Sequence, residues 1–509
     1  MRIATALFSA TAVLLAAAPA LTAEITAEAV RAALPQLEAI VDDVLERTVV
    51  PGIAVAVVVG DEVIHVKGYG VREAGTDEAV DGDTIFQIAS VSKPLASTAV
   101  AAVVGDGTAD WNSRTADLDP GFRMLDPWVT SQVTLADMFS HRTGMPPQAG
   151  DLLEDLGFDR DEILHRFRYL EPTGGFRDSY GYTNFMLTEA TVAAAEAAGT
   201  TWEELIEARV FAPLGMTRSS ARQADFHAAD NRALIHAIED GVARARFERN
   251  PDAQSPAGGI SSTARDMANW IILQLNDGMF EGRQVVDAAA LAETHLPHVV
   301  RGLSRDGSRA LFYGLGWNVD YGDDGAIRLS HAGAFLLGTR TEVTLLPGDR
   351  FGIVVLTNAF PTGAPEAITN AFIDTLQLGA PRMDYLPPLE QAFATMIPRH
   401  VYTAPADPTP AMPAAAYAGL YANDYYGDAE VTQDEAGALV LLLGPGKRPF
   451  ALSHFDRDAF LFDFVGLGDE GEHTVRASFA LADGASADRL VIDLFDQNGQ
   501  GTFTRVTAQ

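Results

Sequence analysis

The sequence contains no cysteine. This absence excludes disulfide bonds, thiolate metal ligands, a cysteine nucleophile and lipid attachment through cysteine. Lysine is almost as scarce, because only Lys67, Lys93 and Lys447 occur among 36 basic residues. A chain of 509 residues is nevertheless long enough to be stabilised by packing alone.

Long apolar runs are also missing beyond the N-terminus, since no later stretch approaches the ~20 apolar residues of a membrane-spanning helix. The chain begins with Arg2, an apolar run over residues 3–18 and small residues up to Ala23. This order predicts a signal peptide over residues 1–23, with cleavage after Ala20 or Ala23. We therefore expect a periplasmic or secreted protein without a stable membrane anchor.

Positive charge is in short supply, and the formal net charge is −33. Nucleic acids and anionic membrane surfaces bind cationic faces, so this balance argues against both as partners. Adaptation to a salty medium explains the same charge equally well. Apolar residues make up 47% and charged residues 21%, as in a globular protein, and the length predicts two or more folded units.

Two predicted hairpins enclose a largely helical middle. Residues 27–48 have apolar side chains at helical spacing, and β-rich runs over 53–59 and 63–69 form the first hairpin. The second hairpin covers 339–346 and 351–357. This pattern predicts one α+β domain over residues 24–380, in which an antiparallel sheet is flanked by helices and accompanied by a helical subdomain.

The last part of the chain has a different texture. Prolines gather over residues 381–413, which predicts a stiff linker. Beyond it, short apolar runs alternate with Gly and Asp turns, at 429–432, 439–443, 450–454, 460–464, 474–481, 490–495 and 502–506. Strands at this spacing predict a small all-β barrel or sandwich over residues 414–509.

Ser90 and Lys93 are the first candidates for chemistry. Good helix-forming residues run from Leu95 to Val104, so Ser90 is expected near a helix start, and Pro94 is tolerated in the first turn. Residues three apart on a helix share a face, which brings the amine close to the hydroxyl. A desolvated lysine can act as a base, whereas an arginine does not release its proton. The structural alternative is a helix-capping serine followed by a surface lysine.

Three separated motifs resemble those of the serine β-lactamase, DD-peptidase and related esterase superfamily. They are Ser90-Val91-Ser92-Lys93, Tyr182-Thr183-Asn184 and His331-Ala332-Gly333. Their order and spacing agree with the family over about residues 30 to 375. Supporting stretches cover residues 139–146, 256–260 and 313–317.

The resemblance implies a role for each residue of these motifs. Ser90 would be the nucleophile, and Tyr182 would share the base role with Lys93 and protonate the leaving group. Asn184 would bind Lys93 and a substrate amide. Tyr180 is an alternative to Tyr182 as the phenol, although a packing role in the same turn explains it more simply. The strand of His331 and Gly333 would form the second wall of the cleft, and the Ala334 N–H would be the second oxyanion donor beside Ser90. His141 would brace a loop.

His331 departs from the family's Lys-Thr-Gly pattern. A mostly neutral imidazole replaces an ammonium group, and Ala332 has no hydroxyl. We therefore expect weaker anchoring of a substrate carboxylate, which disfavours efficient β-lactam hydrolysis and DD-carboxypeptidase activity. The structural alternative for His331 is a buried histidine whose hydrogen bonds are satisfied.

The C-terminal region resembles the small lipocalin-like barrel that follows the catalytic domain in some D-peptidase and esterase relatives. Residues 417–421, 425–428 and 454–455 carry this resemblance. In such relatives the barrel helps to shape the cleft entrance or an oligomer. A stabilising appendage and a binding module both remain open, as does a homo-oligomer.

No metal or organic cofactor is expected. His295 and His298 lie three residues apart, but no third ligand completes a zinc pattern. The sequence therefore predicts a serine hydrolase that cleaves an amide or ester in a peptide or small-molecule substrate through an acyl-enzyme. The rival is a protein that binds penicillin or another ligand without turnover.

Overall fold

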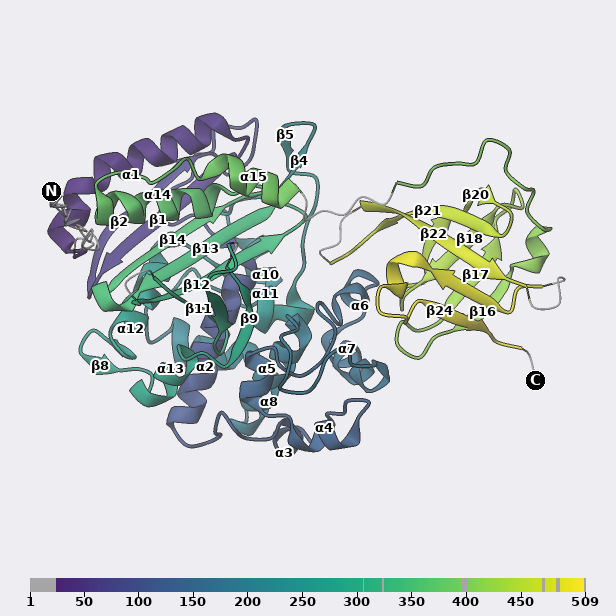
Figure 1. Cartoon of the computed structure of the whole chain (residues 1–509), viewed down its shortest axis with the longest axis horizontal. Coiled ribbons are helices and arrows are strands. Elements are labelled where there is room, and N and C mark those ends of the chain that lie inside the picture. Colours follow the sequence, from purple (N-terminus) through teal and green to yellow (C-terminus); the bar gives the residue numbers. More distant parts are fainter. Residues whose placement is uncertain are drawn as a thin grey trace, which may run out of the picture.

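The computed structural model describes residues 24–304, 306–322, 325–394, 401–468, 472–481 and 486–507. The predicted signal peptide lies outside these ranges. Figure 1 shows a large α+β part that carries the N-terminus and a smaller β part at the opposite end. The α+β class and the small C-terminal β-barrel predicted from the sequence are both confirmed by this architecture.

An eight-stranded antiparallel sheet forms the centre of the large part. In spatial order its strands are β2 (Glu62–Gly70), β1 (Gly52–Val59), β14 (Phe351–Thr357), β13 (Thr339–Leu346), β12 (Ile327–Phe335), β11 (Asn318–Tyr321), β10 (Ala310–Tyr313) and β9 (Val299–Leu303). The two hairpins predicted from the sequence, β1–β2 and β13–β14, pair with each other through β1 and β14. Strands from both ends of the domain therefore share one sheet, as expected.

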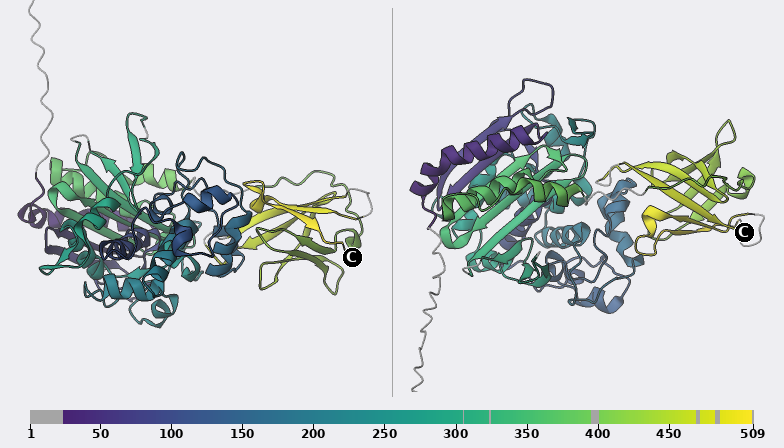
Figure 2. Two further views of the ribbon diagram at one scale, coloured as in Figure 1. Left: turned by 90° about the horizontal axis from the view of Figure 1, so that it is seen from below. Right: turned by 45° about the horizontal axis from the view of Figure 1, so that its top comes forward.

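Helices cover both faces of this sheet. Helices α1 (Ala27–Arg47) and α14 (Ala364–Leu378) pack on one face, and α12 (Ala264–Leu275) packs on the other (Figures 1 and 2). Alternate side chains of β1 enter different cores, because Ile53, Val55 and Val57 join α1 whereas Ala54 and Ala56 face the opposite side. Burial on both faces explains why β1 is a continuous apolar run without polar alternation.

A helical subdomain extends from the α12 face of the sheet. It contains α2 (Ser92–Gly105), α3 (Thr115–Leu118), α4 (Pro127–Gln132), α5 (Leu135–Phe139), α6 (Asp151–Asp155), α7 (Arg160–Arg166), α8 (Asn184–Ala197) and α9 (Trp202–Ile206). Shorter elements follow, namely α10 (Gln223–Ala228), α11 (Ser255–Gly258), α13 (Ala288–Thr294) and the small sheets β15–β4–β5 (Ala359–Phe360, His236–Glu239, Val242–Arg244), β3–β6 (Phe86–Gln87, Ser261–Ser262) and β7–β8 (Met279–Phe280, Arg283–Gln284). Helix α2 is buried along most of its length and crosses the core of this subdomain.

The segment after α14 is not solely a linker. Helix α15 (Leu386–Ala394) lies within the range predicted as a proline-rich linker, and its Leu386 joins the core beneath α1 and α14. Pro387 and Pro388 fall in its first turn, where a missing N–H is tolerated. The boundaries of the linker stay a prediction.

The C-terminal part is a nine-stranded antiparallel sheet that curls into a nearly closed barrel. Its spatial order is β19 (Arg448–Ala451), β18 (Leu439–Leu443), β17 (Ala429–Gln433), β16 (Gly419–Ala422), β24 (Thr502–Arg505), β23 (Arg489–Ile492), β22 (Glu472–Ala480), β21 (Ala459–Val465) and β20 (Ser453–Asp456). Residues 450–454, expected as one strand, belong to β19 and β20, which lie at opposite ends of this order. Only Leu452 separates β19 from β20, so the two edges of the sheet lie close together there, as in a nearly closed barrel.

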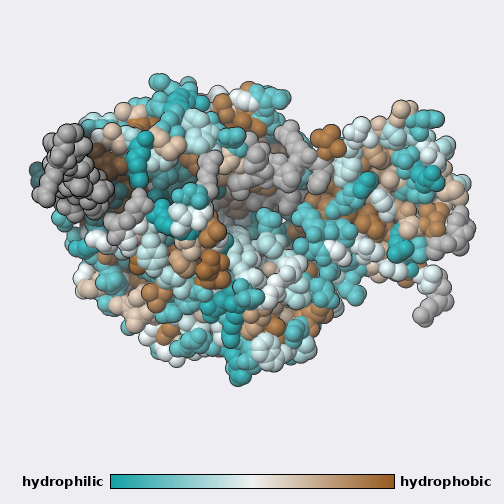
Figure 3. All heavy atoms as spheres, in the orientation of Figure 1, coloured by the Kyte–Doolittle hydropathy of each residue, from teal (hydrophilic) through white to brown (hydrophobic). Residues whose placement is uncertain are grey.

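The face of the molecule drawn in Figure 3 is mostly hydrophilic. Figure 3 shows polar residues over both parts and apolar residues in small, separate patches. No helix in the described ranges combines the length and apolar character needed to cross a bilayer.

Candidate active site

Ser90 lies in a single 3₁₀ turn, Ala89–Val91, directly before α2. The preceding Ala89 is buried and has a φ of 47°, a left-handed conformation that costs about 1–2 kcal/mol for a residue with a Cβ. The half-buried Ser90 lies in this turn, and Lys93 follows in the first turn of α2. The expected position near a helix start is therefore observed, although Ser90 itself precedes the α-helix.

Lys93 is fully buried, which excludes the surface lysine of the structural alternative. Its Nζ lies 3.0 Å from Ser90 Oγ, 2.7 Å from Asn184 Oδ1 and 2.9 Å from the carbonyl oxygen of Ala257. These three acceptors match the three protons of an ammonium group and are themselves uncharged. A buried amine among neutral oxygens has less to lose on deprotonation than one paired with a carboxylate.

Tyr182 completes the contacts of the serine. Its hydroxyl donates to Ser90 Oγ at 2.9 Å, and the Lys93 Nζ lies 4.6 Å from the centre of its ring. Burial raises the pKa of the Tyr182 phenol far above its ordinary value. The phenol is therefore a neutral proton donor at physiological pH. Tyr180 lies in the same turn and contacts His141 and Tyr313 through its ring, as expected for a packing residue.

Asn184 is the first residue of α8 and connects the amine to a carboxylate. Its Nδ2 donates to Asp151 Oδ2 at 3.0 Å, which requires that Oδ1 be the atom that faces Lys93. Asp151 was not identified from the sequence, because it lies 33 residues from Asn184 and belongs to no recognised motif.

Strand β12 forms the opposite wall and carries His331, Gly333 and Ala334. A side chain at Gly333 would clash with the carbonyl oxygen of Ile88 and lie 3.0 Å from the backbone nitrogen of Ser90. This close approach explains the glycine without any need for an unusual φ. It places Ala334, the next residue, beside the nucleophile turn with a half-buried position.

His331 is buried and is held by the protein itself. Its Nδ1 lies 2.9 Å from the carbonyl oxygen of Ala332, so Nδ1 carries the proton, and Nε2 accepts from the Tyr313 hydroxyl at 2.8 Å. Burial, helped by the charge of Lys93, lowers the pKa of His331 to about 3. The imidazole is therefore neutral at pH 7, and both ring nitrogens are engaged. This geometry favours the structural alternative over direct contact with a substrate anion.

The loop that carries Tyr182 is braced from behind by His141. The carbonyl oxygen of His141 accepts from Gly181 N–H at 2.8 Å, and its Nδ1 accepts from Thr183 N–H at 3.2 Å. His141 has a φ of 57°, and burial lowers the pKa of its ring well below the ordinary value. A neutral ring with Nδ1 as acceptor is what this contact requires.

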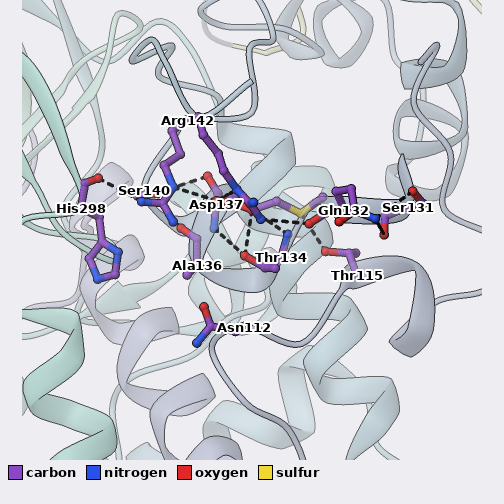
Figure 4. Close-up of polar contacts among 12 residues, drawn as sticks. Asn112, Thr115, Ser131, Gln132, Thr134, Ala136, Asp137, Ser140, Arg142 and His298 are labelled. Carbon is purple, nitrogen blue, oxygen red and sulfur yellow. Dashed lines mark hydrogen bonds and ion pairs between the residues drawn. The ribbon is translucent and has the colours of Figure 1, made fainter. Parts of the chain in front are cut away.

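A buried carboxylate, Asp137, fixes the His141 turn in place. It accepts from Arg142 Nε at 2.7 Å and from Arg177 Nη2 at 2.7 Å, as well as from the Thr134 hydroxyl at 2.9 Å. Figure 4 shows that Arg142 and Thr134 both contact Asp137. Arg142 also donates from Nη1 to the carbonyl oxygen of His298 at 3.0 Å. These donors lower the pKa of Asp137 despite its burial. No sequence motif predicted this network, because its members are spread from residue 134 to residue 298.

The remaining predicted stretches also reach the site. The 256–260 stretch supplies the Ala257 carbonyl for Lys93, and its Ile260 N–H donates to Ser92 Oγ at 3.0 Å. In the 313–317 stretch, Tyr313 holds His331, and Gly316 approaches the Lys93 carbonyl so closely that a Cβ would lie 2.9 Å away. Within the part of the chain that the structure describes, no group of three or more potential metal ligands occurs.

Comparison with known proteins agrees with this arrangement. A family model described as Beta-lactamase matches residues 37–377, and a domain of unknown function, DUF3471, matches residues 403–504. Penicillin-binding protein 4 of Amycolatopsis lactamdurans is 30% identical over 67% of this chain and 90% of its own length. Unguisins hydrolase ungD of Aspergillus violaceofuscus is 26% identical, over 76% of this chain and 74% of its own length.

More distant similarities point the same way. The D-alanyl-D-alanine-carboxypeptidase/endopeptidase AmpH of Escherichia coli is 23% identical over 61% of this chain and 80% of its own length. The octameric penicillin-binding protein homologue from Pyrococcus abyssi has a similar fold, with a TM-score of 0.59 and 17% identity over 90% of this chain and 98% of that chain. The family model spans residues 37–377, which is more than half of the sequence, and the chain therefore belongs to the β-lactamase family.

Proposed function

We propose that this protein is an exported serine hydrolase that cleaves an amide or ester bond through an acyl-enzyme on Ser90. One observation carries the proposal: Ser90 Oγ lies 3.0 Å from a buried amine and 2.9 Å from a neutral phenol. Such a hydroxyl has a proton acceptor on one side and a proton donor on the other. Both are needed for acyl transfer.

The acylation step can be written from the proton donors and acceptors around Ser90. With Lys93 neutral, the Ser90 hydroxyl proton passes to Nζ as Oγ attacks the substrate carbonyl, and a tetrahedral oxyanion forms. Collapse breaks the bond to the leaving group, which takes a proton from Tyr182. Tyr182 is then reprotonated from Lys93, whose ammonium lies over its ring. Water attacks the acyl-enzyme in the same manner, and Ser90 leaves.

The oxyanion is assigned to two backbone donors, the N–H groups of Ser90 and Ala334. The close contact between Gly333 and the Ser90 backbone supports this assignment, because it brings the strand next to the turn that carries the nucleophile. Backbone N–H groups held by a strand and a helix start need no rearrangement when the charge develops.

The substrate class we propose is a D-amino-acid peptide or amide, or a carboxylic ester, with at most weak β-lactamase activity. The names of the relatives include a hydrolase and a carboxypeptidase/endopeptidase. The neutral His331 lacks the charge with which an ammonium would hold a substrate carboxylate. Substrates that depend on that contact should therefore be poor.

Export is proposed from residues 1–23, whose order of charge, apolar run and small residues is typical of a signal peptide, and the expected location is the periplasm or the outside of the cell. We further propose a homo-oligomer, for which the octameric assembly named for the Pyrococcus abyssi homologue is the support.

A second candidate is a receptor that is acylated by penicillin without turnover. The similarity to Penicillin-binding protein 4 favours it. The site would then react through the same serine but retain the acyl group.

One experiment separates these functions. Intact-protein mass spectrometry after a fluorophosphonate or a penicillin probe should show one adduct in the wild type and none in Ser90→Ala. Turnover of p-nitrophenyl esters or D-amino-acid amides that is lost in Ser90→Ala supports the hydrolase. A stable penicillin adduct without turnover supports the receptor, and undiminished hydrolysis by Ser90→Ala refutes both.

A further inference from the structure

Helix α6 (Asp151–Asp155) lies between the catalytic site and the C-terminal barrel. Five residues form too short a helix to be stable by itself. It begins after Gly150, which has a φ of 96° and provides no side-chain cap. Its middle is held by the catalytic domain, because Leu153 is buried in the core and Glu154 pairs with Arg249, and its two ends are held by the barrel. In Figures 1 and 2 its segment lies on the side of the helical subdomain that faces the barrel.

The barrel holds the first end of α6. The Gly150 N–H donates to the Tyr425 hydroxyl at 2.9 Å, and Tyr425 is buried. Arg166 of α7 donates from Nη1 to the carbonyl oxygens of Asp424 and Tyr425, at 2.9 and 3.0 Å. The barrel loop that carries Tyr425 is thus attached to the catalytic domain at two points, one of them the residue directly before Asp151.

The barrel also holds the second end of α6. The Asp155 carboxylate accepts from Gly468 N–H at 2.8 Å, and its carbonyl oxygen accepts from Leu467 N–H at 3.1 Å and from Arg448 Nη1 at 3.0 Å. A Cβ at Gly466 would clash with the Asp155 carboxylate, and one at Gly444 would clash with the Leu156 carbonyl oxygen. Two glycines therefore permit the barrel backbone to approach the helix closely.

The first residue of α6, Asp151, is connected to the catalytic lysine. Asp151 accepts from Asn184 Nδ2 at 3.0 Å, and Asn184 Oδ1 accepts from Lys93 Nζ at 2.7 Å. If the amide turned over, its NH₂ group would face the ammonium, and donor would meet donor. Asp151 thus decides which end of the amide the lysine contacts.

We propose that the C-terminal barrel is a positioning element of the active site: by holding both ends of α6, it fixes Asp151, which orients Asn184 against Lys93. Asp151 and Tyr425 are positioning residues that act on the nucleophile through other groups. The proposal rests on the proposed function only in that hydrolysis is its readout. It gives the matched domain of unknown function a role in this chain.

The first test uses Asp151→Asn in the full-length protein. The new amide can donate as well as accept, so it no longer fixes Asn184 in one orientation, and the negative charge near Lys93 is lost. We expect kcat to fall about tenfold with little change in KM, and the acid limb of the kcat/KM pH profile to move to lower pH. A purely structural role would leave that limb in place. Thermal unfolding of the variant checks that the fold persists.

The second test reaches the site from the barrel. Tyr425→Phe removes the hydroxyl that holds Gly150, and Gly466→Ala pushes the barrel away from Asp155 without deleting a side chain. Both should move the acid limb in the same direction as Asp151→Asn, by a smaller amount. Gly446→Ala is the matched control, because nothing lies within 4 Å of the added Cβ and the site is exposed.

A double-variant cycle decides whether the barrel acts through Asp151. If it does, Tyr425→Phe has little further effect on kcat in the Asp151→Asn background. Additive effects, or an acid limb that stays unmoved in all three variants, would overturn the proposal. The rate at which a fluorophosphonate labels Ser90 distinguishes a failure of the proposed function from a failure of the inference about the barrel. If the wild type is labelled at Ser90 and the variants are labelled at the same rate, only the inference is overturned. If the wild type is not labelled at Ser90, the proposed function is overturned.

Discussion

Lys93 and Asp137 are both fully buried charged residues of the helical subdomain, yet their surroundings differ in kind. The three acceptors around Lys93 are neutral oxygens from a serine, an amide and a backbone carbonyl. Asp137 accepts from two guanidinium groups, and its pKa is lowered accordingly. These acceptors of Lys93 are neutral dipoles, with the Asp151 carboxylate reached through Asn184, whereas Asp137 is paired directly with opposite charge.

The difference separates a reactive group from a structural one. A charge paired with an opposite charge becomes harder to neutralise by proton transfer, so Asp137 holds its network in one state. A buried ammonium that donates to a hydroxyl, an amide and a backbone carbonyl can lose its proton at a smaller cost, because these acceptors carry no net charge of their own. Burial alone therefore does not identify a catalytic residue, whereas the charge of its neighbours does.

The sharpest way to break this comparison is Lys93→Arg. It keeps the charge and removes the ability to release a proton. We expect kcat/KM for a p-nitrophenyl ester to fall by about 10²–10⁴-fold, the range of a lost general base. Circular dichroism and thermal unfolding check the fold. If the arginine variant retained more than about a tenth of the activity, Lys93 would not be the base.

The matching change at the other centre is Asp137→Asn. It leaves Arg142 and Arg177 without their carboxylate, and removal of one partner from a buried pair costs about 3–5 kcal/mol. Because the Arg177 side chain is 45% exposed, we expect a smaller loss of about 2–3 kcal/mol in chemical denaturation.

Asp117→Asn is the matched control for that change. It breaks an exposed pair with Arg114, which should cost less than about 1 kcal/mol. Equal losses in the two variants would contradict the structural role of Asp137. So would an Asp137→Asn enzyme that is inactive but as stable as the wild type.

The smallest expected effect is on the pH dependence of folding stability and comes from His331. This residue adds a third case to the comparison, a titratable group that is buried in its neutral form. Its pKa is about 3 in the folded protein and 6.5 as a free side chain, so below pH 6.5 the unfolded chain binds a proton that the folded chain does not. Stability is therefore lost as the pH falls. In urea titrations, the wild type should lose about 1.3 kcal/mol more stability than His331→Gln between pH 5.5 and pH 4.5.

Other buried groups titrate in the same window but are present in both proteins. They include His295, whose pKa is lowered to about 4, and Glu342, whose pKa is raised to about 7 and acts in the opposite direction. The difference between the two proteins isolates His331. Parallel stability curves would show that the imidazole is charged in the folded state.

Many helices and strands of the catalytic domain could be predicted from local sequence patterns. Residues 53–59 and 63–69 became β1 and β2, and residues 339–346 became β13 without a shift. Residues 27–48 became α1 with one residue fewer. Apolar periodicity sets such elements, because a strand or helix must bury one face wherever it ends up in the fold.

The barrel was predicted less accurately. Strand β16 was not among the expected strands, and residues 493–496 form a 3₁₀ helix where a strand end was expected. Short strands in a barrel take their ends from closure and not from their own composition, so local pattern carries little information about them.

What the sequence determined by itself is the proximity of Ser90 and Lys93, since a three-residue spacing at a helix start brings their side chains together in almost any fold. Only the tertiary structure decided that the amine is buried, that the Ala257 carbonyl and Asn184 surround it, and that Asp151 and the barrel stand behind them. Contacts across 33, 164 and 275 residues depend on packing, and a backbone carbonyl has no side chain to reveal it.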